Sequence, residues 1–349
     1  MALTQYFEKD EFNPIEADVI IVDETSMMDV MLSGSLLRAV QIGTCLIMVG
    51  DVDQLPPVGP GSVLKDVIES GCIPVVCLTE VFRQAQESAI IMNAHAINNG
   101  QYPDLSDKKN DFFFINCTHS SAGMVADKIL SLVSERLPKY LNCDAMADIQ
   151  VLSPMKKGEL GTIALNKLLQ SRLNPPSPKA REREYGFKTF RCGDKVMQIK
   201  NNYDIPWTSC VSGKKEEGEG LFNGEMGIVV GINEEGVVDV EFDCGRVAPL
   251  SGSMLDDLDL SYATTIHKSQ GSEYKAVVIP IWDGPPMLLT RNLIYTAVTR
   301  ARELVVLVGS PEALQRMIDN TYTAKRHTGL VWRLRELFWK QGDAVAKPA

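Results

Sequence analysis

The chain has 349 residues, about two domains of ordinary size, and can bury a sizeable core. Apolar residues make up 45% and charged residues 23%. This globular composition excludes fibrous and disordered proteins, and the length excludes a miniprotein that needs disulfides or metals to fold. The net charge of −10 argues weakly against a nonspecific nucleic-acid coat.

The sequence contains no apolar run of about 18 residues and no basic, apolar leader at its start. Its eight cysteines form no CxxC pair, and the four histidines show no ligand spacing with them. We therefore expect no membrane partner, no zinc site and no disulfide framework. A reducing, cytoplasmic setting fits this cysteine usage best.

Short apolar runs predict buried strands that alternate with helix-length segments, which favours an α/β fold with parallel sheets. The strands are expected at 19–22, 45–49, 75–78, 112–115, 149–152, 276–281 and 304–308. The helices are expected at 88–98, 124–137, 162–173 and 288–301. Residues 190–260 differ, because glycines and alternating apolar residues there predict a small inserted β-barrel. Within it, the charged, glycine-rich stretch 212–220 is predicted to be a loop.

Positive charge gathers in one window of this otherwise acidic chain. Residues 153–200 hold eleven Lys or Arg against four acids, so the window carries +7. A solvated basic face and a groove for a polyanion both explain such a window, and composition alone leaves the two open.

The first candidate site follows the run VIIVDE at 19–24. Asp23 and Glu24 lie at the carboxyl end of a predicted buried strand, where open α/β sheets bind ligands. The run resembles a Walker B box, in which the Asp holds Mg²⁺ through water and the Glu orients the attacking water. Taken alone, the run is a weak signal, and an ordinary turn at the strand end explains it better.

Two further strand ends carry polar residues. The run GDVDQLPPV at 50–58 places Gln54 at a strand end, directly before a loop stiffened by two prolines. The run LTEVFRQ at 78–84 places Arg83 just past a third strand, although a lone arginine there is also explained as a surface cation.

Two late segments are dense in polar groups. The stretch YATTIHKSQGSEY at 262–274 gathers hydroxyl, imidazole, amine and amide donors ahead of a strand, which few cores accommodate without function. The stretch YTAVTRAR at 295–302 is predicted to lie on a helix. Arg300 and Arg302 are about 200° apart on such a helix, so we expect Arg300 to contact phosphate and Arg302 to be solvated or to cap the helix.

Six segments in this order resemble helicase motifs II to VI of superfamily 1, including the DNA-contact segment after motif IV. They are DETSMMD, GDVDQLPPV, LTEVFRQ, VLSPMKKGELGTIALN, TIHKSQGSE and YTAVTRAR. The resemblance is greatest to the RecD-like group, which includes the alpha subunit of exodeoxyribonuclease V, and it extends from about residue 17 to 310. It implies two RecA-like motor domains, at 1–92 and at 93–189 plus 261–349, with an SH3-like β-barrel at 190–260 inserted in the second.

The resemblance also implies an ATP-dependent, 5′ to 3′ DNA helicase of repair or recombination that uses ATP and Mg²⁺. Asp23 would hold Mg²⁺ through water and Glu24 would serve the attacking water. Gln54, Arg83 and Arg300 would contact the γ-phosphate, and Glu273 the nucleotide sugar. Single-stranded DNA is the implied partner, with other subunits of a recombination complex as further partners. The implied DNA contacts are Pro56, Val58, Ser153, Pro154, Lys156, Asn166, Thr265, His267 and Ser269.

The sequence departs from the family pattern at one point. It contains no GxxxxGK[ST] loop, whose amides and lysine hold the phosphates. We therefore expect a C-terminal fragment of a longer helicase, with the first motor domain truncated at its N-terminus and no ATPase activity of its own. The alternative is a non-hydrolysing DNA-binding or scaffold module that has lost this loop. A nuclease has little support, because no further carboxylate cluster is visible.

Overall fold

A computed structural model of the chain describes residues 7–79, 87–106, 111–178, 181–211, 214–322 and 326–345. The chain divides into two compact units. One contains Met1–Arg83 together with Thr321–Ala349, and the other contains Gln84–Asn320. The expected second motor domain ran to residue 349, whereas the segment from Thr321 groups with the first unit, because its helix packs there.

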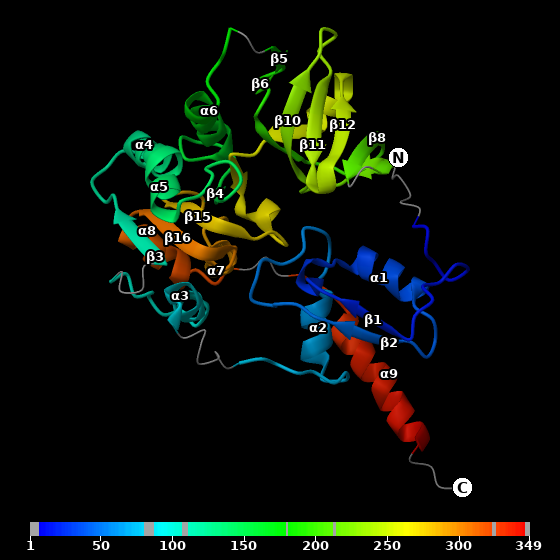
Figure 1. The fold of residues 1–349 in the computed structure, drawn as a ribbon. Coiled ribbons are helices and arrows are strands. Elements are labelled where there is room, and N and C mark those ends of the chain that lie inside the picture. Colours follow the sequence, from blue (N-terminus) through cyan, green and yellow to red (C-terminus); the bar gives the residue numbers. More distant parts are fainter. Residues whose placement is uncertain are drawn as a thin grey trace. The chain divides into compact units, whose positions relative to one another are not determined.

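The first unit contains a two-stranded parallel sheet of β1 (Val19–Val22) and β2 (Cys45–Met48). Its described helices are α1 (Val30–Ala39), α2 (Val63–Ser70) and α9 (Leu330–Val345) (Figure 1). The guanidinium of Arg335 on α9 donates to the carbonyls of Glu69 and Ser70, at 2.6 and 3.1 Å. These are orphan carbonyls at the end of α2, so the contact caps that helix and holds α9 in this unit.

The prediction of a buried strand at 75–78 is wrong. These residues belong to no strand, and Leu78 is 93% exposed. Among the described residues of this unit, β1 and β2 pair only with one another. The apolar run at 75–78 therefore has no neighbouring strand to form hydrogen bonds with its backbone N–H and carbonyl groups.

The second unit is built on a five-stranded parallel sheet in the order β14-β4-β15-β16-β3. Its strands are β3 (Phe112–Asn116), β4 (Ile149–Ser153), β14 (Ala263–Thr265), β15 (Tyr274–Ile281) and β16 (Ala301–Gly309). One face packs on α4 (Ala122–Ser131) and α6 (Thr162–Leu173) through a buried apolar core. The sheet also contacts α3 (Ala89–Asn98), α7 (Arg291–Val298) and α8 (Pro311–Asp319). This parallel sheet with its helices confirms the predicted α/β class.

A seven-stranded antiparallel sheet lies in the inserted region, in the order β13-β7-β10-β11-β12-β8-β9. Its strands are β7 (Lys195–Gln198), β8 (Asn202–Val211), β9 (Lys214–Leu221), β10 (Met226–Ile232), β11 (Val238–Phe242), β12 (Arg246–Leu250) and β13 (Leu258–Leu260). It wraps a separate apolar core to which β11 contributes alternate residues, as its sequence pattern predicts. A hairpin of β5 (Glu182–Tyr185) and β6 (Lys188–Arg191) precedes it.

The stretch 212–220 is not a loop where the structure describes it. Residues from Lys214 onward form β9, which pairs with β8 despite its charge. Gly218 explains part of this pairing, since a Cβ at that position would lie 2.4 Å from the ring of Trp207. The glycine lets the indole of the paired strand lie against the backbone, so it serves packing and not mobility.

Candidate functional site

The carboxyl ends of β1 and β2 bring two predicted motifs together. Val22 is opposite Met48, and the hydroxyl of Thr25 donates to the carbonyl of Val49 at 2.7 Å. Gly50 fills the narrow space between them, because a Cβ there would lie 2.9 Å from the Thr25 hydroxyl and from the amide of Ser26. The DETSMMD and GDVDQLPPV segments are therefore neighbours, as parallel pairing predicts.

Asp23 and Glu24 occupy the turn at this edge. Glu24 has a left-handed backbone, with φ of +52°, and its N–H donates to Asp23 Oδ1 at 2.7 Å. Asp23 is exposed, which suits a carboxylate that reaches a metal through water. The described residues contain no group of three His, Cys, Asp or Glu arranged to hold a metal. The exposed carboxylate of Asp23 therefore fits Mg²⁺ that is held through water, with further waters and phosphate oxygens as its direct ligands.

The loop after β2 presents an exposed tip on a buried base. Gln54 and Leu55 are buried, whereas Val58 is 91% exposed. Arg326, from the C-terminal segment, donates to the carbonyls of Pro57, Gly59 and Gly61. One planar guanidinium thus satisfies three carbonyls of the loop backbone and fixes the tip that carries Val58.

Arg83 lies outside the described residues. The other predicted phosphate contact, Arg300, is 5% exposed, and its guanidinium donates to Thr296 O, Ser272 O and Thr299 Oγ1 at 3.3–3.4 Å. Glu273, the predicted sugar contact, is exposed just before β15.

The prediction that Arg300 and Arg302 share a helix is wrong. Helix α7 ends at Val298, and Arg302 is an exposed residue of β16. The Arg300 carbonyl accepts the N–H of Tyr274 at 2.8 Å, so pairing with β15 begins here and keeps the following backbone extended. The two side chains still differ in exposure, although strand geometry and not a helical angle separates them.

In the second unit, parallel pairing again joins two motifs. Thr265 at the end of β14 is opposite Ser153 at the end of β4. The loop from Pro154 to Gly161 and the 3₁₀ turn η6 (Ile266–Ser269) therefore leave the sheet side by side. Two segments that the resemblance assigns to DNA are neighbours at one edge of this sheet.

Three of the predicted DNA-contacting side chains are instead engaged inside the protein. The Ser153 hydroxyl donates to Leu160 O at 2.7 Å, and the Ser269 hydroxyl donates to Ile266 O at 2.9 Å. Asn166 accepts the N–H of Ala263 and donates to Leu260 O and Ala263 O, at 2.8–2.9 Å. All three are buried, so their side chains shape the two loops in this structure, and their contact with DNA stays a prediction.

The remaining predicted DNA contacts differ in exposure. Lys156 and His267 are exposed, and Thr265 and Pro56 are partly buried. Pro154 is buried, so its ring shapes the loop and does not face solvent. Lys156 and His267 are thus the side chains of the second unit that remain placed to meet a ligand in the manner predicted.

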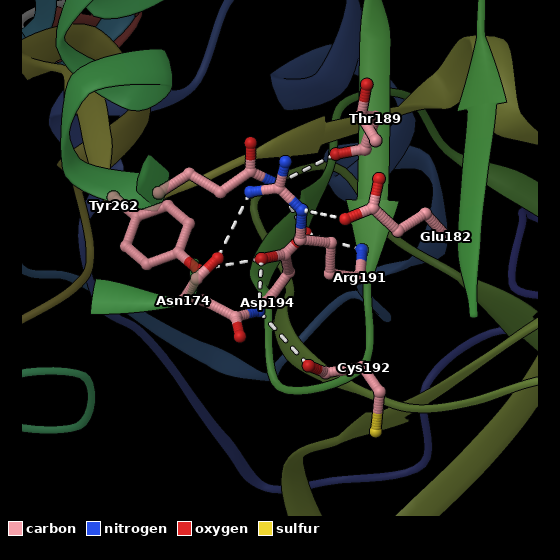
Figure 2. Close-up of polar contacts among 8 residues, drawn as sticks. Asn174, Glu182, Thr189, Arg191, Cys192, Asp194 and Tyr262 are labelled. Atoms are coloured by element: carbon pink, nitrogen blue, oxygen red, sulfur yellow. Dashed lines mark hydrogen bonds and ion pairs between the residues drawn. The ribbon is translucent and has the colours of Figure 1, made fainter. Parts of the chain in front are cut away.

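A buried polar network joins α6, the turn after the β5–β6 hairpin and Tyr262, which directly precedes β14. Asp194, which is fully buried, accepts from Gln170 Nε2 and the Arg191 N–H at 2.7 Å, from Asn174 Nδ2 at 2.7 Å and from the Tyr262 hydroxyl at 2.8 Å (Figure 2). Burial raises the pKa of Asp194, although these four donors favour its ionised form. The network ties the inserted β domain to the motor-like sheet.

Sequence reasoning missed Arg326 and the Asp194 network. Tyr262 lies inside a stretch already singled out for its polar density, and that density was the available signal. Asp194 and Arg326 belong to none of the six segments, and their partners are distant in the sequence. Only folding brings these groups together.

Three family descriptions match successive parts of the chain. Residues 3–120 match an AAA domain, residues 165–242 match the ATP-dependent RecD-like DNA helicase SH3 domain, and residues 260–308 match the UvrD-like helicase C-terminal domain. The second match confirms the prediction of an SH3-like domain between two motor-like parts. Among the described residues, no helix has the length and apolar character needed to cross a bilayer.

Curated relatives carry RecD names. The chain is 36% identical over 332 residues to the ATP-dependent RecD2 DNA helicase of Deinococcus radiodurans, covering 95% of this chain and 42% of that protein. It is 30% identical over 338 residues to the RecBCD enzyme subunit RecD of Mycolicibacterium smegmatis, covering 94% of this chain and 56% of that protein. The chain thus spans about half the length of these relatives.

Solved structures of Pif1 helicases are also similar to this chain. Bacteroides Pif1 in complex with ADP-AlF3 and ssDNA matches with a TM-score of 0.48 and 18% identity, over 94% of this chain and 77% of that chain. On the RecD-like SH3 match, the flanking AAA and UvrD-like matches and the two RecD relatives, the chain is similar to RecD-like DNA helicases over most of its length.

Proposed function

We propose that this chain carries motifs II to VI of an ATP-dependent DNA helicase of the RecD-like group, and that its second unit binds single-stranded DNA. The observation that carries the proposal is the parallel pairing of β4 with β14. It sets the loop bearing Lys156 beside the turn bearing His267. Exposed cationic and ring groups at adjacent strand ends suit a backbone of phosphates and unstacked bases.

In the first unit, the same proposal places the nucleotide-binding site at the carboxyl ends of β1 and β2. Asp23 would hold Mg²⁺ through water, Glu24 would orient the attacking water, and Gln54 would sense the γ-phosphate. Bound ATP with Mg²⁺ would supply the transferable phosphoryl group. Arg83, Arg300 and Glu273 keep their predicted nucleotide roles as proposals. The 5′ to 3′ direction and association with subunits of a recombination complex are likewise proposed from the resemblance.

Titration of labelled oligo-dT, at several salt concentrations, tests the DNA-binding proposal. We expect salt-sensitive binding with little sequence preference, because stacking and phosphate neutralisation dominate. His267→Ala should weaken it about 5-fold or more, since base–aromatic stacking contributes about 1–3 kcal/mol. Equal affinity of His267→Ala and the unaltered chain would remove this side chain from the DNA path, and no binding by either would contradict the proposal.

The chain by itself is expected to hydrolyse ATP negligibly, because its sequence contains no GxxxxGK[ST] loop to clamp the β- and γ-phosphates. Phosphate release with saturating single-stranded DNA measures this. A multiple-turnover rate that disappears in Glu24→Gln would contradict the expectation. Undetectable release with intact DNA binding is the result we expect of this chain.

A further inference from the structure

Two lysines from separate segments pair with one carboxylate in the second unit, and a third lysine is near them. Lys188 Nζ lies 2.7 Å from Asp259 Oδ1, and Lys156 Nζ lies 4.0 Å from Asp259 Oδ2. Lys268, in η6, is close enough to all three for their charges to act on its ammonium group. The DNA contacts implied by the resemblance do not include Lys188, Lys268 or Asp259.

The three lysines are held to different degrees. Lys188 is committed to the fold, because its Nζ also donates to Leu258 O at 2.7 Å. Lys156 is only loosely paired, since 4.0 Å is too long for a hydrogen bond and its side chain is 61% exposed. Lys268 is half-buried and makes no ion pair in the described part of the chain.

The cluster has more positive than negative charge. Burial lowers the pKa of Lys268, and Lys156 and Lys188 lower it further, whereas only Asp259 raises it. The neighbouring carboxylate of Asp257 lies 2.6 Å from the ammonium of Lys200. Asp259 is therefore the counter-ion of Lys188 and, more loosely, of Lys156, and an added anion would relieve the repulsion that these two lysines exert on Lys268.

The position of the cluster indicates which anion it takes. Lys156 belongs to the loop after β4 and Lys268 to the turn after β14, and these strands are paired neighbours. We propose that Lys156 and Lys268 together hold one backbone phosphate of single-stranded DNA, above a fixed base made by the Lys188–Asp259 ion pair. This inference rests on the proposed function, because it places a phosphate subsite on the same DNA path.

Asp259 has a definite part in this subsite. Its Oδ1 stays bonded to Lys188, while Lys156 leaves Oδ2 for the incoming phosphodiester. Asp259 thus keeps the unliganded lysines together and competes with DNA for Lys156. Removing the charge of Asp259 should therefore strengthen DNA binding. If the carboxylate instead contacted DNA bases or a metal, its removal would weaken binding.

Anisotropy titration of labelled oligo-dT, with the chain unaltered otherwise, tests the subsite. Lys156→Gln and Lys268→Gln should each weaken binding about 3- to 10-fold and reduce the slope of log K against log salt by about 0.7, the value for one phosphate contact on a single strand. The double variant should lose less than the product of the two single losses, because both lysines hold the same phosphate. Asp259→Asn should tighten binding about 3-fold at low salt.

Lys139→Gln is the matched control, because Lys139 is an exposed lysine of α5 (Leu137–Leu141). Its neighbour Tyr140 packs on Phe113 of β3, at the sheet edge opposite β14. Lys268→Arg should keep affinity near that of the unaltered chain and so exclude a folding defect as the cause.

Losses in Lys156→Gln and Lys268→Gln no larger than in Lys139→Gln would overturn the subsite, as would fully multiplicative losses or weaker binding in Asp259→Asn. In each of these cases the unaltered chain still binds oligo-dT, so the proposed function stands. Absence of any binding by the unaltered chain would overturn the proposed function and the subsite together.

Discussion

The loop after β2 in the first unit and the strand β14 in the second unit are both held in place by distant residues, but by different chemistry. Arg326 holds the first through three backbone carbonyls, with a partly exposed charged group. Asn166 holds the second with a buried neutral amide. The amide accepts the N–H of Ala263 in β14 and donates to the carbonyls of Ala263 and of Leu260, which precedes β14. The comparison teaches that a motif's backbone can be held from outside the motif by a charged guanidinium or from a neighbouring helix by a buried amide.

The largest effect is expected from Asn166→Ala. The change removes three hydrogen bonds and leaves buried backbone groups near Ala263 unpaired, which should cost about 4 kcal/mol of the free energy of unfolding of the second unit. Urea unfolding measures the total, and hydrogen exchange of residues 260–269 reports the local loss. Lys167→Ala is the control, since this exposed neighbour on α6 should change stability by less than about 0.5 kcal/mol. Equal effects would show that the amide does not support β14.

A smaller effect is expected in the first unit from Arg326→Ala. The loss of charged donors to Pro57, Gly59 and Gly61 should destabilise the loop by about 3 kcal/mol, because hydrogen bonds to a charged group contribute about 1.5–3 kcal/mol each and water replaces part of them. Hydrogen exchange of residues 50–61 should accelerate. Arg333→Ala, which changes an exposed arginine of α9, should leave that exchange unaltered. Unchanged hydrogen exchange in Arg326→Ala would mean that the loop keeps its conformation without this arginine.

The smallest effect is expected from the titration of Lys195, a buried lysine of the second unit. Burial lowers the pKa of Lys195 from 10.5 to about 8, although Asp144 and Asp148 raise it. Between about pH 8 and 10.5 the unfolded chain binds more protons at this lysine, so the stability of the second unit should rise with pH by about 2 kcal/mol. Below pH 8 both states are protonated and the cost of the buried charge is fully present. Lys195→Met should stabilise the unit at pH 7 and abolish this rise.

Unfolding at pH 7 and pH 10, for both forms, measures the difference. Other groups titrate over the same window, but their contributions cancel when the variant is subtracted from the unaltered chain. A rise of the same size in Lys195→Met would assign the pH dependence to those other groups.

The sequence by itself determined the features that depend on local pattern. Apolar runs located β1, β2, β3, β4, β15 and β16, and alternation located β11. Carboxyl ends of parallel strands share an edge, but only the observed β1–β2 pairing brings Asp23–Glu24 beside the GDVDQLPPV loop. The ordered motifs identified the RecD-like resemblance, which the family comparisons confirm.

Tertiary structure alone decided which side chains face a ligand and which residues hold the loops. An apolar run such as 75–78 becomes a strand only where a neighbouring strand can pair with it, and charged β9 becomes one because β8 does so. Ser153, Asn166 and Ser269 turned inward because buried carbonyls and an N–H needed partners there. Arg326 and Lys268 acquired their neighbours through folding, and such long-range contacts are absent from local periodicity.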